Sequence, residues 1–135
     1  MSVVYFLDDC LSRTNIFKEK IPDALTFEKA DLIIKALSEE KRHIDYLFLD
    51  HDLGGESNVD PQRADTGAEV VRFLAKNKIN IGRVIVHSHS QTGSFLMFDE
   101  LKKAGYKTDK ILFLTLDREF LSRKISLEDF LDAWV

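Results

Sequence analysis

Four short runs dominated by apolar residues constrain the fold of this chain more than any other feature. They are VVYFL at 3–7, YLFL at 46–49, RVIV at 83–86 and ILFL at 111–114. Each run is too short for a typical helix and rich in β-branched or aromatic residues, a pattern typical of parallel strands buried on both faces. A weaker candidate strand lies at 23–26.

Apolar residues at helical spacing separate these runs. The patterns lie at 30–37, 66–74, 92–101 and 126–134. Thr66 and Ser126 open sequences that resemble capping boxes, Thr92 is a candidate cap, and residues 11–17 are expected to form a short helix. Alternating strands and helices predict an α/β, flavodoxin-like fold, a three-layer sandwich with a five-stranded parallel sheet in the order 2-1-3-4-5.

Length and composition narrow the class of protein. The 135 residues suit a single domain spanning 1–135. The one cysteine, Cys10, excludes a disulfide framework and favours a reducing cytoplasm. We find no signal peptide and no apolar stretch of membrane-spanning length, so no membrane association is expected. A net charge of −4 argues against nonspecific binding to duplex DNA.

Polar residues follow the strong strands, at the ends where such sheets bind ligands. In the predicted strand order, the first, third and fourth strands are neighbours, so their ends converge on one crevice. The residues concerned are Asp8 and Asp9 after the first strand, Asp50, His51 and Asp52 after the third, and His87, Ser88, His89 and Ser90 after the fourth.

The carboxylates at these strand ends predict a metal site. Asp8, Asp9, Asp50 and Asp52 would repel one another at close range, and a bound cation would offset that repulsion. Carboxylate ligands suit Mg²⁺ or Mn²⁺, and the neighbouring histidines widen the choice to Zn²⁺ or Fe²⁺. A metal surrounded by serine and histidine donors is typical of a site that handles phosphate.

Each of these residues also has an ordinary structural interpretation. Asp8 and Asp9 can end a strand simply because the chain turns there. Asp52 precedes two glycines and suits a turn. His51 can point to solvent, and Arg13 is either an ordinary surface arginine or a ligand for a phosphate group. The agreement between three separate strand ends favours a functional site.

The motifs VVYFLDD, DYLFLDHDLG and RVIVHSHS resemble the strand ends of bacterial response-regulator receiver domains. The resemblance implies that Asp8 and Asp9 are the acidic pair, Asp50 the phosphate acceptor and Ser88 the hydroxyl of a receiver. Two features depart from that pattern. The predicted fifth strand, 111–114, ends without the receiver lysine, and the histidines are not receiver hallmarks.

A narrower resemblance rests on several short motifs in order. LDD with a following arginine, LDHDLG with a later DTG, and VHS followed by a glycine and a methionine resemble the cyclic-phosphate processing receiver domains. This implies a role in processing cyclic phosphates on nucleotides or RNA ends. Candidate catalytic residues are then His87, His89, His51 and Ser88, and candidate substrate-binding residues are Arg13, Ser90, Thr66 and Gly67.

Three functions are compatible with these residues. The leading hypothesis is a metal-dependent phosphoesterase in which His87 or His89 moves protons, because imidazole titrates near neutrality. The first alternative is a stand-alone receiver phosphorylated on Asp50. The second is a non-catalytic protein that binds a phosphorylated ligand. In each case the expected partner is a phosphorylated small molecule or an RNA end.

Overall fold

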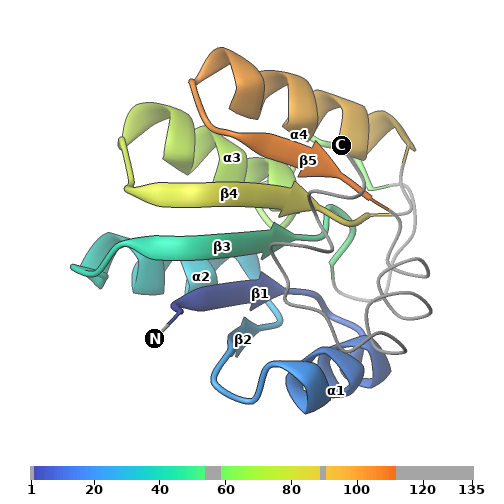
Figure 1. The fold of residues 1–135 in the computed structure, drawn as a ribbon. Coiled ribbons are helices and arrows are strands. Elements are labelled where there is room, and N and C mark those ends of the chain that lie inside the picture. The colour runs from blue at the N-terminus through green and yellow to red at the C-terminus, as the bar shows by residue number, and fades with distance from the viewer. Residues whose placement is uncertain (1, 54–58, 89–90, 112–135) are drawn as a thin grey trace.

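The computed structural model describes residues 2–53, 59–88 and 91–111. A five-stranded parallel sheet in the order β2-β1-β3-β4-β5 forms its centre (Figure 1), which confirms the predicted topology. No helix in these ranges is both long and apolar enough to cross a bilayer. The elements are β1 (Val4–Leu7), α1 (Leu11–Lys20), β2 (Leu25–Phe27), α2 (Ala30–Glu39), β3 (Ile44–Leu49), α3 (Gly67–Lys76), β4 (Ile81–Val86), α4 (Gln91–Lys103) and β5 (Thr108–Lys110).

Side chains alternate between the two faces of the sheet, and each face has its own core. On β1, Tyr5 and Leu7 pack with the buried faces of α2, α3 and α4. Val4 and Phe6 belong to the opposite core, to which α1 contributes Phe17. The sheet therefore lies between two helical layers, with three of the described helices on one side and α1 on the other (Figure 1).

The fifth strand is not where the sequence predicted it. β5 is Thr108–Lys110, just before the apolar run 111–114; Ile111 follows the strand, and 112–114 lie outside the described residues. Among the described residues this strand pairs with β4 alone, so an exposed lysine is tolerated there and no apolar run marks the strand in the sequence. The helix predicted at 126–134, with Ser126, also lies outside the described residues.

Two predicted helix caps differ in detail. Thr66 is the N-cap of α3, but its hydroxyl donates to the Arg63 carbonyl and makes no side-chain cap. Glu69 accepts a hydrogen bond from Arg72 at 2.6 Å, so the predicted capping box does not form. Thr92 lies inside α4, which begins at Gln91, so it is not a cap.

The strand register fixes what meets at the carboxyl edge of the sheet. Leu7 pairs with Leu49, and Leu49 pairs with Val86. The next peptide continues this pairing, because the Asp50 N–H donates to the Leu7 carbonyl and the His87 N–H donates to the Leu49 carbonyl. The residues that follow the three strands therefore lie side by side.

Glu40 joins the end of α2 to the first strand. Its carboxylate accepts hydrogen bonds from the Tyr5 hydroxyl at 3.0 Å and from Arg42 Nη2 at 2.8 Å. The bonds from Arg42 lower the pKa of Glu40 to about 2, and burial raises the pKa of Tyr5 to about 12. The interaction therefore depends on an ionised Glu40.

We predict that Glu40→Gln lowers the unfolding free energy at pH 7 by about 1 kcal/mol, or roughly 4 °C in Tm, because charge-assisted hydrogen bonds are lost. The pKa of Glu40 falls on folding, from 4.5 to about 2, so its contribution is complete above pH 5 and disappears as the pH falls from 4.5 toward 2. Thermal melts of both proteins between pH 2 and 7 measure this. The exposed neighbour Glu39→Gln is the control, and a Tm difference that stays constant with pH would contradict the prediction.

Candidate functional site

Three carboxylates converge at the carboxyl edge of the sheet. One oxygen from each of Asp8, Asp9 and Asp50 lies within 4.8 Å of the other two. Asp8 and Asp50 are buried, whereas Asp9 is partly exposed. Burial, and then the negative charge of Asp8, raise the pKa of Asp50 to about 8. The cluster therefore favours either a proton or a cation over three free negative charges.

Arg13 supplies a positive charge to this cluster from the first turns of α1. Its Nε lies 2.8 Å from Asp8 Oδ2 and its Nη2 lies 2.9 Å from Asp8 Oδ1. The guanidinium is also 3.5 Å from Asp50 and 3.9 Å from Asp9. The hydrogen bonds to Asp8 raise the pKa of Arg13 above its ordinary value. Arg13 thus lies within the site, and its contact with a phosphate group stays a prediction.

His87 lies beneath the carboxylates, in the core on the α1 side. Its ring stacks on Phe6, with centroids 4.9 Å apart and an interplanar angle of 6°. His87 Nδ1 is 3.7 Å from Asp8 Oδ2. Burial lowers the pKa of His87 to about 4, against the opposing effect of Asp8, so the imidazole is neutral at pH 7. Its neighbour Ser88 is buried, and its hydrogen bond with Asp50 moderates the rise in the Asp50 pKa.

His51 and Asp52 form a separate pair. His51 is fully buried, and its Nδ1 lies 2.7 Å from Asp52 Oδ1, which also accepts a hydrogen bond from the Val59 N–H. A Cβ at Gly93 of α4 would collide with the imidazole, so α4 packs directly against it. Within the described ranges, Asp52 is not part of the carboxylate cluster, and His51 Nε2 has no hydrogen-bond partner.

Thr66 and Gly67 bring α3 against the end of β3. Both are buried, and the Gly67 N–H donates to the His51 carbonyl at 2.9 Å. A Cβ at Gly67 would collide with the backbone carbonyl of Asp50, so only glycine permits this approach. These residues therefore position the backbone of the site, and their contact with a substrate stays a prediction. His89 and Ser90 lie outside the described residues.

The structure contains a lysine at the end of the fifth strand. The sequence did not indicate it, because the strand was expected at 111–114. Lys110 ends β5 and is exposed, and its Nζ lies 4.4 Å from the ring centroid of Phe95 on α4. The next residue, Ile111, packs in the core on the α1 side, which is the side of His87 and Asp8. The Lys110 ammonium thus contacts the Phe95 ring on the α4 side of the sheet.

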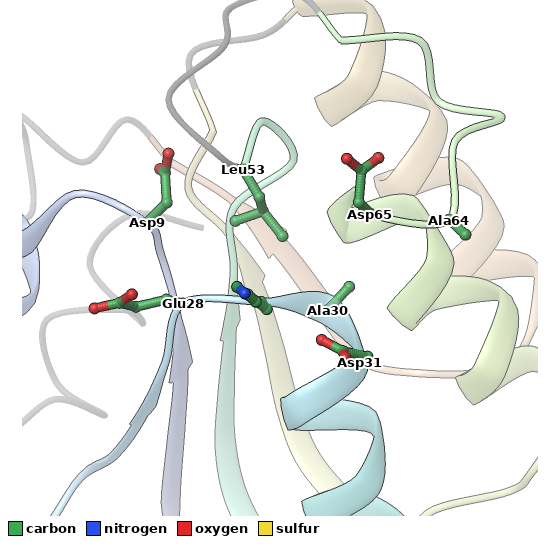
Figure 2. A pocket seen from close by; sticks show the side chains of 8 residues that line it. Asp9, Glu28, Ala30, Asp31, Leu53, Ala64 and Asp65 are labelled. Carbon is green, nitrogen blue, oxygen red and sulfur yellow. The ribbon is translucent and has the colours of Figure 1, made fainter.

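A cavity of about 620 Å³ opens beside Asp9 and was not foreseen from the sequence. It lies between the start of α2 and the segments that follow β1 and β3 (Figure 2). Its lining comes from residues far apart in the sequence, from Asp9 through Glu28 and Leu53 to Asp65. Only the folded chain brings these segments together.

The fold and the position of the acidic cluster define a receiver-type domain. The signal receiver domain of a protein described as a Luxo repressor, from Vibrio parahaemolyticus, matches with a TM-score of 0.61 at 17% identity, over 98% of this chain and 86% of that one. A receiver domain from Methylobacillus flagellatus matches with a TM-score of 0.59 at 15% identity, over 98% of both chains.

A third match is a response regulator from Burkholderia pseudomallei, described with a phosphorylated aspartic acid, a calcium ion and citrate. Its TM-score is 0.61 at 13% identity, over 98% of this chain and 66% of that one. The family model of the cyclic-phosphate processing receiver domain matches residues 3–103. The chain therefore belongs to that family. A search of the curated proteins gives no significant match.

The donor set fits a hard divalent cation. Asp8, Asp9 and Asp50 offer carboxylate oxygens at mutual distances that one ion can bridge, and oxygen ligands are those that Mg²⁺ and Mn²⁺ prefer. Burial, followed by the negative charge of Asp8, raises the pKa of Asp50, and a cation at the cluster would favour its ionised form. Arg13 already neutralises part of that charge, so an ion must compete with it.

We predict that Mg²⁺ or Mn²⁺ raises the Tm, by several degrees at about a hundredfold excess over Kd, because a ligand of the folded state alone stabilises it. Asp50→Asn should remove this shift while leaving the metal-free protein folded. Asp23→Asn, an exposed position outside the cluster, is the matched control. Melting curves unchanged by Mg²⁺, Mn²⁺ and Zn²⁺ would refute the metal site.

We further predict that Arg13→Gln tightens metal binding roughly tenfold, because it removes a positive charge that lies within 3.9 Å of each of the three carboxylates. Titration calorimetry with Mn²⁺ measures the change against wild type. If Arg13 instead supports the site as a scaffold, the variant should bind metal more weakly. The two models therefore predict opposite signs.

Proposed function

We propose that this domain hydrolyses a cyclic phosphate carried by a nucleotide or an RNA end, with a divalent cation bound at the acidic cluster. The observation that carries the proposal is an imidazole in register with two carboxylates at the sheet edge. His87 Nδ1 lies 3.7 Å from Asp8, and Asp50 lies between the ends of β1 and β4. A receiver that takes a phosphoryl group on an aspartate needs no imidazole there. Membership of the cyclic-phosphate processing family supports the same reaction.

The charge of the site also suits a cyclic phosphate better than a phosphomonoester. A cyclic phosphodiester carries one negative charge, whereas its hydrolysis product carries about −1.5 to −2 at pH 7. Three carboxylates and one guanidinium surround the site. The substrate is therefore repelled less than the product, which favours product release.

In the proposed reaction a water oxygen bonds to phosphorus and one of the two ring P–O bonds breaks. The leaving oxygen takes up a proton, and a phosphomonoester remains. In this proposal Arg13 and Ser88 contact the non-bridging oxygens, and a cation on Asp8, Asp9 and Asp50 would stabilise the negative charge of the transition state. Because the His87 imidazole is neutral at pH 7, it would accept a proton, and Asp8 would stabilise the resulting charge. His87 and His89 are the two candidate proton carriers.

The second candidate function is a receiver phosphorylated on Asp50. The acidic cluster and the Ser88 hydrogen bond to Asp50 favour it, as does the phosphorylated aspartic acid of the Burkholderia structure. Lys110 counts against it, because its ammonium lies over Phe95 on the α4 side. A third candidate is a domain that binds a phosphorylated ligand without turnover.

We predict that His87→Phe, which keeps a ring to stack on Phe6 but removes both ring nitrogens, stays folded. This variant, His89→Ala, or both should lose about 10²–10⁴-fold in hydrolysis of a nucleoside 2′,3′-cyclic phosphate, the usual contribution of a positioned acid or base. The exposed His43→Ala is the control. Hydrolysis by both variants at the wild-type rate would count against the enzyme.

The same proteins distinguish the alternatives when incubated with acetyl phosphate. The proposal predicts no stable phosphoryl group on Asp50 in intact-mass spectra. A stable adduct that Asp50→Asn abolishes, without hydrolysis of any cyclic phosphate in a broad panel, would establish the receiver. Binding of cyclic phosphates without turnover or adduct would establish the non-catalytic binder.

A further inference from the structure

The cavity beside Asp9 has a size and a lining suited to one small organic group. Its volume of about 620 Å³ falls in the range of ligand pockets, which are largely apolar with a few placed polar groups. Leu53, Ala30 and Ala64 supply apolar surface, and Figure 2 shows the Leu53 side chain between Asp9 and Asp65. A flat, partly apolar group has a surface to pack against here.

The polar groups around this surface are mostly hydrogen-bond acceptors. Carboxylates come from Asp9, Glu28, Asp31 and Asp65, and Lys29 is the one cationic residue among the described residues of the lining. Asp65 is paired with Arg63 at 2.6 Å, and Asp9 belongs to the carboxylate cluster, so the proposal relies on Glu28 and Asp31 to meet a ligand. The cavity therefore favours a group that donates hydrogen bonds over a group that carries negative charge.

The start of α2 does not turn this cavity into a phosphate site. A helix N-terminus attracts anions through its free N–H groups and its dipole. Here Asp31 lies in the first turn and Glu28 lies just before the helix, so their negative charges oppose that attraction. A second phosphate group of a ligand is thus disfavoured in the cavity.

The cavity and the carboxylate cluster share Asp9. Its carboxylate contributes to the cluster, within 4.8 Å of oxygens of Asp8 and Asp50, and the same residue lines the cavity. Asp9 would therefore border both a group in the cavity and a phosphate at the cluster. That spacing suits the two halves of a single nucleotide.

We propose that this cavity binds the nucleoside of the substrate, and that it selects bases carrying an exocyclic amine. This inference rests on the proposed function and names its substrate class. The exocyclic amines of adenine, cytosine and guanine can donate hydrogen bonds to carboxylates, whereas uracil carries carbonyl oxygens and no exocyclic amine. The ribose is linked directly to the phosphate at the cluster, and no further phosphate enters the cavity.

The test compares turnover of adenosine, cytidine, guanosine and uridine 2′,3′-cyclic phosphates with that of glycerol 1,2-cyclic phosphate, which has no base. We expect the three amine-bearing nucleotides to exceed both uridine and glycerol substrates at least tenfold in kcat/KM. The double variant Glu28→Gln and Asp31→Asn should lose this preference. Ala64 is exposed, so Ala64→Leu should leave the fold intact while its larger side chain obstructs the cavity. The preference is read as the ratio of each nucleotide's kcat/KM to that of the glycerol substrate in the same variant, so that a general change in activity cancels, and Glu39→Gln at the far end of α2 is the control.

Equal kcat/KM values for all five substrates, with turnover intact, would refute the nucleoside pocket and leave the proposed function standing. If no substrate is turned over, the proposed function fails, and NMR titration with the free nucleosides tests the pocket alone. Shifts at Leu53 and Ala64 with adenosine but not uridine would support it, and their absence would refute it. A short RNA ending in a 2′,3′-cyclic phosphate, compared with the mononucleotide, tells whether the nucleoside comes from an RNA end or a free nucleotide.

Discussion

The in-register parallel pairing of β1, β3 and β4 is the constraint on which the site depends. Each strand is buried on both faces, so none can slip by one residue without moving a whole row of side chains to the opposite core. The register aligns Leu7, Leu49 and Val86, and the residue after each strand then meets its neighbours at the edge of the sheet. Hydrophobic burial thereby fixes the positions of Asp8 and Asp50, although burial opposes their charge.

This conflict between packing and charge gives the site its chemistry. Asp50 is held where its ionised form is disfavoured, as its pKa of about 8 shows, and Arg13 compensates only part of the negative charge. The negative charge that Arg13 leaves uncompensated favours binding of a cation at the cluster. It also disfavours groups that carry much negative charge. A monoanionic cyclic phosphate and an uncharged nucleoside are the ligands that this balance tolerates best.

Asp9 connects the two halves of the proposed substrate site. It contributes to the cluster where a phosphate would be processed and to the cavity where a nucleoside would bind. The buried His51–Asp52 pair lies apart from both and joins β3 to the loop that follows, through the Val59 N–H. In this proposal, catalysis and recognition both involve Asp9 after β1, whereas Asp52 after β3 pairs with His51 and binds the Val59 N–H.

The sequence by itself determined the strand order and the meeting of Asp8, Asp9 and Asp50, because short apolar runs mark buried strands and parallel strands end at one edge. Only the tertiary structure showed which helices the residues next to Asp50 pack against. His51 follows Asp50 directly, yet its imidazole packs against Gly93 of α4, because successive residues of an extended chain point to opposite faces. Asp52 pairs with this imidazole and stays outside the carboxylate cluster. The sequence did not predict β5 at its observed position, because this edge strand is only partly buried and has no apolar run. It did not predict the cavity either, because segments far apart in the sequence line it. Local patterning thus specified the sheet, whereas side-chain direction and the cavity came from packing between segments far apart in the chain.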